Sequence, residues 1–392
     1  MSRSLRIAMI APFGIRPKGT LLARMLPLAQ ALARRGHSTS IVAPPVQNPQ
    51  DAGQTEIYGG VTVTHTARLL RPEPLAVAQQ SVALLRAALT ARPDVVHLFK
   101  PKGYGGLAAL LLQRLRPGLP LVVDTDDWEG WGGWNDLLPY PRPAKALFAW
   151  QERDLPRRAD AVTVASRTLE TLVWGFGVPP QQVVYLPNGI AGDIPMLSAR
   201  RPASEDAPTV LLYTRFWEFR VADLVATLVA VAQRRPDVRL RVIGQGERGE
   251  EQELLRLARR AGVAGMVDYR GWVEPAQIPE LIAGCHAALV PVDDTLINRA
   301  RCSAKLLELM AAGLPVAGSR VGQMGEYLEE ERSGLLAAPG DQAGLARALL
   351  RLLDDPPLRE RLGANARARA TGVFAWERLA REAERAYEIA LR

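Results

Sequence analysis

Cysteine is scarce in this sequence, which has only Cys285 and Cys302 among 392 residues. Two cysteines cannot form a disulfide framework, so the sequence predicts a protein of a reducing compartment, the cytoplasm. Long apolar runs are missing too, since none reaches the roughly 18–20 residues that a membrane-spanning helix needs. The apolar stretch near the N-terminus ends in Pro12-Phe13-Gly14. It predicts a first β-strand rather than a signal peptide.

Lysine is also rare, because only five of the 49 basic residues are lysines, while the formal net charge is +8. Zinc-finger spacing and the aromatic-basic pattern of RNA-binding sheets are absent, so nucleic acid is not an expected partner. The positive excess still favours anionic partners, such as sugar diphosphates or an acidic lipid surface. Peripheral contact with the inner face of a membrane is compatible with this charge.

The chain is too long for one ordinary hydrophobic core, so its length predicts two domains. Short apolar runs alternate with helical patterns, which is typical of parallel α/β sheets. A polar, proline-containing stretch at 191–207 predicts a linker between domains at 1–190 and 208–373. An amphipathic helix is expected at 374–392, and ligands of such sheets bind at the carboxyl ends of the strands.

The expected elements follow from apolar runs and from helix-end signals. Strands are predicted at Arg6–Pro12, Ser38–Ala43, Val95–Leu98, Leu121–Thr125, Ala161–Ala165, Val183–Leu186, Thr209–Tyr213, Arg239–Ile243, Val267–Tyr269, Ala287–Pro291 and Pro315–Gly318. Helices are predicted at Leu21–Arg35, Gly249–Ala261, Ala304–Ala312 and Ala343–Leu353.

Three motifs in the second half carry chemistry. Arg215 and Arg220 follow a strand directly, and their planar forks suit a pair of phosphates, although both could simply be solvated. Gly244 and Gly246 form a Gly-x-Gly turn that lets a ligand approach the backbone, and its bland alternative is a tight βα turn. Glu308 lies in an apolar helix, where a buried carboxylate needs a partner, either a ribose diol or Lys305 three residues earlier.

In this order and at these separations, the motifs resemble those of the retaining GT-B glycosyltransferases of family 4, the group 1 glycosyltransferases. Arg215 and Arg220 fall on the family's arginine and lysine. Residues 308–316 resemble its Glu-Ala-Met-Ala-x-Gly-x-Pro-Val segment. Residues 185–190 resemble its Pro-Asn-Gly-Val segment, and 374–376 resemble the start of its terminal helix, so the likeness spans nearly the whole chain.

The resemblance implies two Rossmann-like doubly wound domains that face a central cleft, with the acceptor on the N-terminal side. It implies transfer of a hexose from a nucleotide-diphosphate donor, UDP-sugar or GDP-sugar, to an acceptor hydroxyl, with retention of configuration and without metal or cofactor. Arg215 and Arg220 would neutralise the departing diphosphate, where charge builds up in the transition state. Glu308 would hold the ribose. Further donor contacts are expected from Gly19, Gly244, Gly246, Trp272, Val273, Lys305 and Leu306.

Two features depart from the family pattern. Ala300 stands where a second glutamate usually contacts the donor sugar, which leaves the identity of that sugar open. None of the four histidines lies where the family often places one, just after a central strand of the first domain. That strand runs instead into Asp126 and Asp127. These aspartates are candidate catalytic residues that bind acceptor hydroxyls or stabilise positive charge on the sugar; they could instead cap a helix or hold Mg²⁺.

Four further residues are acceptor-side candidates because they surround those two aspartates in the sequence or follow the preceding strand. Tryptophan faces stack on sugars and also favour membrane interfaces, although a packed lid or hairpin is a slightly better explanation of these residues. The candidates are Lys100, Trp128, Glu129 and Trp131. The acceptor itself, a glycan, a lipid or a small molecule, stays open. A sugar-nucleotide epimerase and a non-catalytic scaffold that binds nucleotide sugars are the alternative functions on the same fold.

Overall fold

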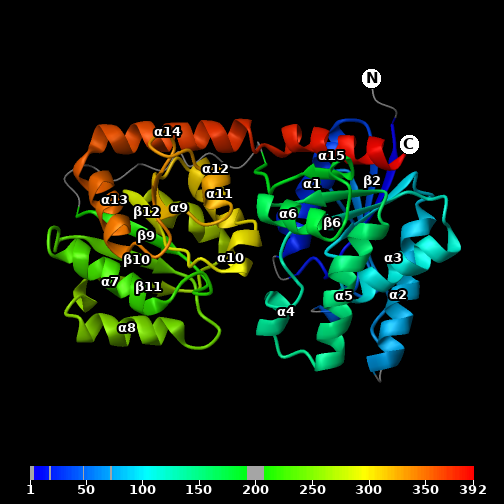
Figure 1. The fold of residues 1–392 in the computed structure, drawn as a ribbon, viewed down its shortest axis with the longest axis horizontal. Coiled ribbons are helices and arrows are strands. Elements are labelled where there is room, and N and C mark those ends of the chain that lie inside the picture. The colour runs from blue at the N-terminus through cyan, green and yellow to red at the C-terminus, as the bar shows by residue number, and fades with distance from the viewer. Residues whose placement is uncertain (1–3, 17–18, 47, 71–72, 192–206) are drawn as a thin grey trace. The chain divides into compact units, whose positions relative to one another are not determined.

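The computed structural model describes residues 4–16, 19–46, 48–70, 73–191 and 207–392 (Figure 1). These residues form two compact units. The first comprises the chain up to residue 191 together with 300–302 and 374–392, and the second comprises the remaining residues of 192–373. Most of the predicted linker, 192–206, lies outside the described residues.

The first unit has an eight-stranded sheet in the order β3-β4-β2-β1-β5-β6-β7-β8, in which only β3 runs antiparallel to its neighbour. Its strands are β1 (Arg6–Ile10), β2 (Ser38–Ala43), β3 (Thr55–Tyr58), β4 (Val61–His65), β5 (Val95–Phe99), β6 (Leu121–Thr125), β7 (Ala161–Val164) and β8 (Val183–Tyr185). Its helices are α1 (Leu26–Arg34), which a π-helical turn at Leu21–Met25 precedes, α2 (Glu73–Thr90), α3 (Gly103–Leu115), α4 (Trp134–Leu137), α5 (Arg142–Arg158), α6 (Arg167–Gly175) and α15 (Trp376–Ala390).

Both faces of this sheet are buried, as expected for parallel strands with helices on each side. Alternate residues of β1 show the division, since Ile7 and Met9 pack in one core with α1 and α15, while Ala8 and Ile10 pack in the other with α2 and α3. The C-terminal helix therefore belongs to the first unit, and Tyr387 of α15 is fully buried there.

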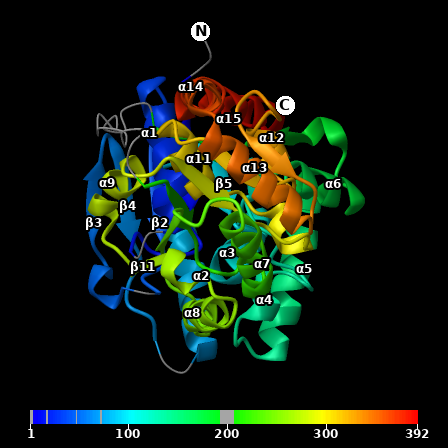
Figure 2. The same cartoon turned by 90° about the vertical axis from the view of Figure 1, so that its left-hand side faces the viewer.

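The second unit has a six-stranded parallel sheet in the order β11-β10-β9-β12-β13-β14. Its strands are β9 (Thr209–Tyr213), β10 (Arg239–Ile243), β11 (Val267–Gly271), β12 (Ala287–Val290), β13 (Val316–Ser319) and β14 (Leu335–Ala337). Its helices are α7 (Val221–Ala232), α8 (Glu250–Arg260), α9 (Ile278–Ala283), α10 (Leu296–Ala300), α11 (Ala304–Ala311), α12 (Met324–Tyr327), α13 (Gln342–Asp354) and α14 (Pro356–Gly372). Figure 2 turns this unit toward the viewer, with α7 and α8 packed side by side.

The two sheets confirm the predicted doubly wound α/β class and all eleven predicted strands to within about two residues at each end. Strands β3, β4 and β14 were not predicted, and among the described helices the predicted ranges cover only α1 with the turn before it, α8, α11, α13 and α15. No helix of the described residues is long and apolar enough to cross a membrane.

Candidate functional site

The loop after β9 carries the two arginines expected to bind a diphosphate. The Arg215 side chain is 66% exposed, and its Nη2 lies 2.9 Å from Glu247 Oε1. Arg220 is the N-cap residue of α7 and is 74% exposed, with its Nη2 2.6 Å from Asp223 Oδ2. Its backbone amide donates to Asp293 Oδ2 at 3.0 Å. Carboxylates thus hold both guanidiniums in place, while their exposure leaves them open to an anion.

A buried turn fixes the backbone between these arginines. Phe216 has a φ of +64°, a left-handed conformation that is uncommon for a residue with a side chain. The Phe216 amide donates to Thr214 Oγ1 at 2.7 Å, and the Thr214 hydroxyl donates to Glu218 Oε2 at 2.9 Å. Phe216 and Phe219 are buried beneath the loop. The loop that presents Arg215 and Arg220 is therefore preorganised by its own hydrogen bonds.

The Gly-x-Gly turn lies directly against this loop. Gly244 has a φ of +124°, and a Cβ atom there would lie 1.7 Å from the Thr214 carbonyl oxygen. Only glycine allows the turn after β10 to approach the turn after β9 this closely. The Gly246 amide donates to Glu251 Oε2 at 3.1 Å, so a carboxylate of α8 occupies this amide.

The first turn of α11 lies beside the end of β9. The Lys305 Nζ is 4.7 Å from the centre of the Tyr213 ring, which is a cation–π contact. Burial, and after it the negative charge of Glu308, raise the pKa of Tyr213. Leu306 is buried, and its amide donates to Ser303 Oγ at 3.3 Å. Lys305 therefore meets the β9 side of the arginine loop, Glu308 follows it three residues later on the same helix, and Leu306 serves the helix itself.

Trp272 and Val273, the residues expected near the nucleobase, follow β11 on the surface of the second unit. The Trp272 side chain is 64% exposed, and Val273 is half-buried. Ala300, which stands at the position of the family's second glutamate, is fully buried and belongs to the first unit. Its carbonyl accepts a hydrogen bond from Ser166 Oγ at 2.7 Å. A glutamate here would place a charge among the apolar side chains of that core.

In the first unit, Lys100 brings together three of the predicted acidic residues. Its Nζ lies 2.9 Å from Asp126 Oδ1, 2.6 Å from Asp127 Oδ2 and 3.1 Å from Glu129 Oε1. Lys100 directly follows β5 and has a φ of +55°, and the carboxylates follow β6, its neighbour in the sheet. The carboxyl ends of two adjacent parallel strands thus build one charged cluster.

Lys102 extends this cluster. Its Nζ lies 2.8 Å from Glu129 Oε2 and 3.1 Å from Asn135 Oδ1. Three aromatic rings surround the ammonium, with centroid distances of 5.5 to 5.9 Å. These rings belong to Phe13, Tyr140 and Phe148. Lys102 and Glu129 are both buried, so they form the inner, structural part of the cluster.

Burial and charge set the protonation of these groups. Burial would lower the pKa of Lys100, but the three carboxylates outweigh it and raise that pKa well above its usual range. Burial would raise the pKa of Glu129, but Lys100 and Lys102 hold it below its usual range. Burial raises the pKa of Asp127 more than Lys100 lowers it, and Asp126 and Glu129 add to the rise. Asp127 is also the most exposed carboxylate of the cluster, at 27%.

The tryptophan-rich segment after β6 divides into a packed part and an exposed part. Trp128 stacks on Phe176 at a centroid distance of 6.0 Å, and its Nε1 donates to the Trp131 carbonyl at 2.9 Å. Gly130 and Gly133 lie so close that added Cβ atoms would meet Trp128 at 2.4 and 2.3 Å. Trp131 is 56% exposed. Trp128 is therefore part of the packing of this segment, whereas Trp131 presents its aromatic ring to solvent.

Two other residues complete the surroundings of the cluster. Gly19 is exposed and directly precedes Thr20, whose Oγ1 donates to Asp126 Oδ2 at 3.3 Å. Glu152 of α5 is buried, and its Oε2 has no hydrogen-bond partner among the described residues. Burial, and after it the charge of Glu129, raise the pKa of Glu152 well above its usual range. Glu152 gave no sequence signal, because it lies in an otherwise ordinary helix.

The alternative that the aspartates hold a metal finds no support in their contacts. A lysine ammonium, rather than a vacant centre, stands between Asp126, Asp127 and Glu129. Within the described ranges, no group of three His, Cys, Asp or Glu side chains is arranged to hold a metal ion.

Comparisons with known proteins match both units. Residues 19–189 match the family described as "Glycosyl transferase 4-like domain", and residues 207–355 match "Glycosyl transferases group 1". The chain is 28% identical over 304 residues to "Glycogen synthase" of Mycobacterium tuberculosis, covering 77% of this chain and 70% of the relative. It is 26% identical over 403 residues to "Phosphatidyl-myo-inositol mannosyltransferase" of Mycolicibacterium smegmatis, covering 98% and 94%.

A solved structure supports the same fold. HepE of Anabaena in complex with UDP has a TM-score of 0.67 and 18% identity to this chain, with 98% and 99% of the two chains covered. This similarity confirms the predicted GT-B fold.

Proposed function

The chain belongs to the group 1 glycosyltransferases of family 4, enzymes that transfer a sugar from a nucleotide sugar, and we propose that its donor is a UDP-sugar and that transfer retains the anomeric configuration. We further propose that side chains, rather than a metal ion, supply the positive charge at the diphosphate. The acceptor is a hydroxyl group.

The observation that carries the proposal is the set of cations around the end of β9. Arg215 and Arg220 lie on one rigid loop, and Lys305 approaches the same strand end through its contact with Tyr213. Negative charge grows on the leaving diphosphate in the transition state, so fixed cations there lower the barrier. Both arginines already pair with carboxylates, which orients them before the donor arrives.

Glu308 supplies the complementary polar contact. A carboxylate can accept hydrogen bonds from both hydroxyls of a ribose, and Glu308 is half-buried, three residues after Lys305 in α11. One nucleotide would then meet Lys305 with its diphosphate and Glu308 with its ribose. UDP is favoured as the leaving group because HepE, which shares the fold, binds UDP.

The Lys100 cluster is proposed to serve the acceptor side. Asp127 is the most exposed of its carboxylates and is held by Lys100 Nζ at 2.6 Å. It can accept a hydrogen bond from an acceptor hydroxyl and steady the positive charge that develops on the sugar. With retention, attack occurs on the face that the diphosphate leaves, so a phosphate oxygen can take the acceptor proton. No protein nucleophile is required in this scheme.

We propose that the enzyme associates peripherally with a membrane surface, where it would meet a lipid acceptor. The net charge of +8 and the exposed Trp131 favour peripheral contact with an anionic bilayer. Sedimentation with anionic vesicles tests this contact, and Trp131→Ser should release part of the bound protein. Equal sedimentation of the variant and the wild type would remove Trp131 from the proposal.

Calorimetric titration with UDP, GDP and ADP tests the proposed donor. UDP should bind most tightly, and Arg220→Ala should weaken it roughly tenfold or more, since hydrogen bonds to charged groups contribute about 1.5–3 kcal/mol each. Tighter binding of GDP would mean that the base of the donor is guanine, with the roles of Arg215 and Arg220 unchanged. Conversion of a free nucleotide sugar into its epimer would instead favour the alternative epimerase.

A further inference from the structure

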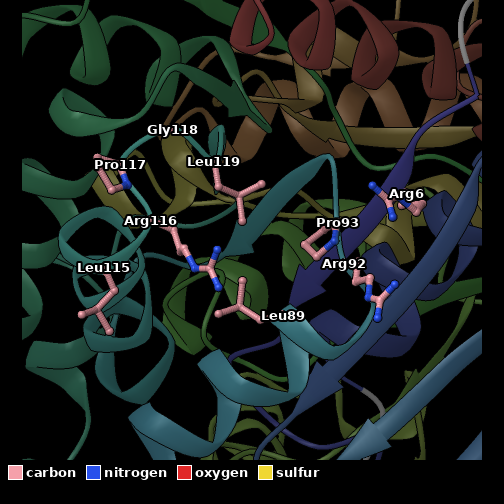
Figure 3. A pocket seen from close by; sticks show the side chains of 9 residues that line it. All are labelled: Arg6, Leu89, Arg92, Pro93, Leu115, Arg116, Pro117, Gly118 and Leu119. Carbon is pink, nitrogen blue, oxygen red and sulfur yellow. The ribbon is translucent and has the colours of Figure 1, made fainter.

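A groove of about 550 Å³ opens at the edge of the first sheet where β1, β5 and β6 begin (Figure 3). The loops that enter these strands from α2 and α3 form its walls. The groove is lined by Arg6, Leu89, Arg92, Pro93, Leu115, Arg116, Pro117, Gly118 and Leu119. The Lys100 cluster follows the carboxyl ends of β5 and β6, so the groove lies at the opposite edge of the sheet.

Two arginines of the groove have uncommitted guanidinium groups. Arg6 is neutralised by Asp94, whose Oδ1 lies 2.8 Å from Arg6 Nη2. Across the described part of the chain, the guanidinium groups of Arg92 and Arg116 have neither an ion pair nor a hydrogen bond. In Figure 3 the Arg116 side chain extends toward Leu89, with Leu119 beside it. The groove therefore joins two available cations to an apolar wall.

Helix ends explain only part of this charge. Helices α2 and α3 both end here, and the C-terminus of a helix carries a partial charge of about −0.5, which favours cations. Two such ends cancel at most about one of the two positive charges. Arg359 donates to the carbonyls of Leu352 and Leu353 at the end of α13. The guanidinium groups of Arg92 and Arg116 make no such bonds to the described carbonyls of α2 and α3. A net positive charge remains available to a ligand.

The backbone at Arg92 strengthens the case for a side-chain role. Arg92 has a φ of +46°, in the region that favours glycine, at the exit from α2. Glycine would meet this conformation without strain, so the turn itself gives no reason for arginine. Leu115, at the end of α3, is 63% exposed beside Arg116. An exposed leucine beside an available guanidinium suits a ligand with an apolar body and an anionic end.

We propose that this groove binds a small phosphomonoester, whose phosphate is attracted by the positive charge of Arg92 and Arg116 and whose organic body rests on Leu89, Leu115 and Leu119. The guanidinium fork matches phosphate oxygens in pairs, and a groove of about 550 Å³ lies within the range of sites for small ligands. This site is separate from the proposed donor site of Arg215, Arg220 and Lys305, which lies in the second unit. It would be a second, non-catalytic ligand site.

The test uses the full chain with Arg215→Ala, Arg220→Ala and Lys305→Met, so that the proposed donor site has lost its three cations. Phenyl phosphate is titrated by calorimetry, with inorganic phosphate and phenol as the two halves of the ligand. Phenyl phosphate should bind more tightly than either half. Adding Arg92→Gly or Arg116→Ser should weaken it roughly tenfold each, and adding Arg114→Ser, an exposed neighbour outside the groove, should leave it unchanged.

Three outcomes would overturn the proposal. These are no binding of phenyl phosphate, binding that Arg92→Gly and Arg116→Ser leave unchanged, and binding to anionic vesicles but not to phenyl phosphate. The last would assign the groove to a lipid surface. Arg92→Gly is not expected to disturb folding, because glycine adopts the left-handed backbone conformation readily. The melting temperature of this variant should be no lower than that of its parent. The donor-site substitutions are present in every sample. The result of this test therefore does not depend on whether the proposed function is correct.

Discussion

The Lys305 ammonium lies 4.7 Å from the centre of the Tyr213 ring, which joins the first turn of α11 to the last residue of β9. Lys305 and Tyr213 are 92 positions apart in the sequence, yet they place a third cation beside the loop of Arg215 and Arg220. This contact ties the helix that carries Glu308 to the strand that carries the arginines. The account of donor binding depends on it.

Replacement of that cation should weaken the nucleotide complex. Lys305→Met keeps most of the side-chain volume but removes a charge-assisted contact worth about 1.5–3 kcal/mol, so the Kd for UDP should rise roughly tenfold or more. Tyr213→Phe keeps the ring and serves as the matched control, with a change of less than about threefold. Calorimetric titration measures both. An unchanged Kd in Lys305→Met would remove Lys305 from the donor site.

The close approach of the β9 and β10 turns can be tested at Gly244. A Cβ there would meet the Thr214 carbonyl oxygen at 1.7 Å, and φ is +124°. Gly244→Ala should therefore lower the free energy of unfolding of the second unit by at least about 3 kcal/mol. Gly262 also has a positive φ, +76°, but has no atom within 4 Å of its added Cβ.

Gly262→Ala separates backbone strain from collision. It should cost only about 1–2 kcal/mol, because it carries the conformational penalty alone. Urea denaturation followed by circular dichroism measures both variants. Equal costs would mean that the Gly244 turn can open, and that the arginine loop is less rigid than its hydrogen bonds indicate.

The core strands could be predicted from the sequence, because central strands of a parallel sheet are continuous apolar runs, as in Leu121–Thr125. Strand β4 could have been predicted as well, because Val61–His65 alternates valine with polar residues as a half-buried strand does. Strand β3 could not, because Thr55–Tyr58 is largely polar and its strand conformation depends on antiparallel pairing with β4.

Loss of the cluster's central cation should destabilise the first unit strongly. Lys100→Met leaves the buried carboxylates of Asp126 and Glu129 without their shared partner, which should cost about 3–5 kcal/mol. Lys145 lies 3.9 Å from Asp136 in a more exposed pair, so Lys145→Met should cost about 1 kcal/mol or less. Urea denaturation compares them. Similar small costs for the two variants would show that the Lys100 cluster is open to water.

The buried Glu152 predicts a specific pH dependence. Its pKa is raised in the folded state, so the folded protein binds more protons than the unfolded chain between the ordinary glutamate pKa, about 4.3, and the folded pKa. Its contribution to stability therefore falls as the pH rises through that window. Glu152→Gln has no carboxyl group to titrate, so the variant should gain stability relative to the wild type as the pH rises from the ordinary glutamate pKa toward the raised pKa of the folded protein.

Urea denaturation across that pH range measures the difference between the two curves. Glu377→Gln, which removes an exposed carboxylate, controls for the loss of one negative charge. Parallel curves for Glu152→Gln and the wild type would mean that Glu152 is ionised in the fold, with a partner for its charge.

Part of the site was also accessible from the sequence, and part was not. Lys100 and Asp127 could be placed together because each follows a central strand, and adjacent parallel strands end at the same edge. The contact of Lys102 with Asn135 joins positions 33 apart, and Glu152 enters from a helix that shows no motif. Such contacts follow from tertiary packing, so no local pattern reports them. The place of Ala300 in the first unit is non-local in the same way.

Release of nucleotide from UDP-, GDP- and ADP-sugars tests the central claim most directly. Incubated with each donor, the wild-type chain should slowly release UDP, with the sugar freed in its original anomeric configuration and with no loss of rate in EDTA. Arg220→Ala should lose at least about tenfold in rate, as expected when a charge-assisted contact in the transition state is removed. Tight UDP binding without turnover, or release that Arg220→Ala leaves unchanged, would contradict the account.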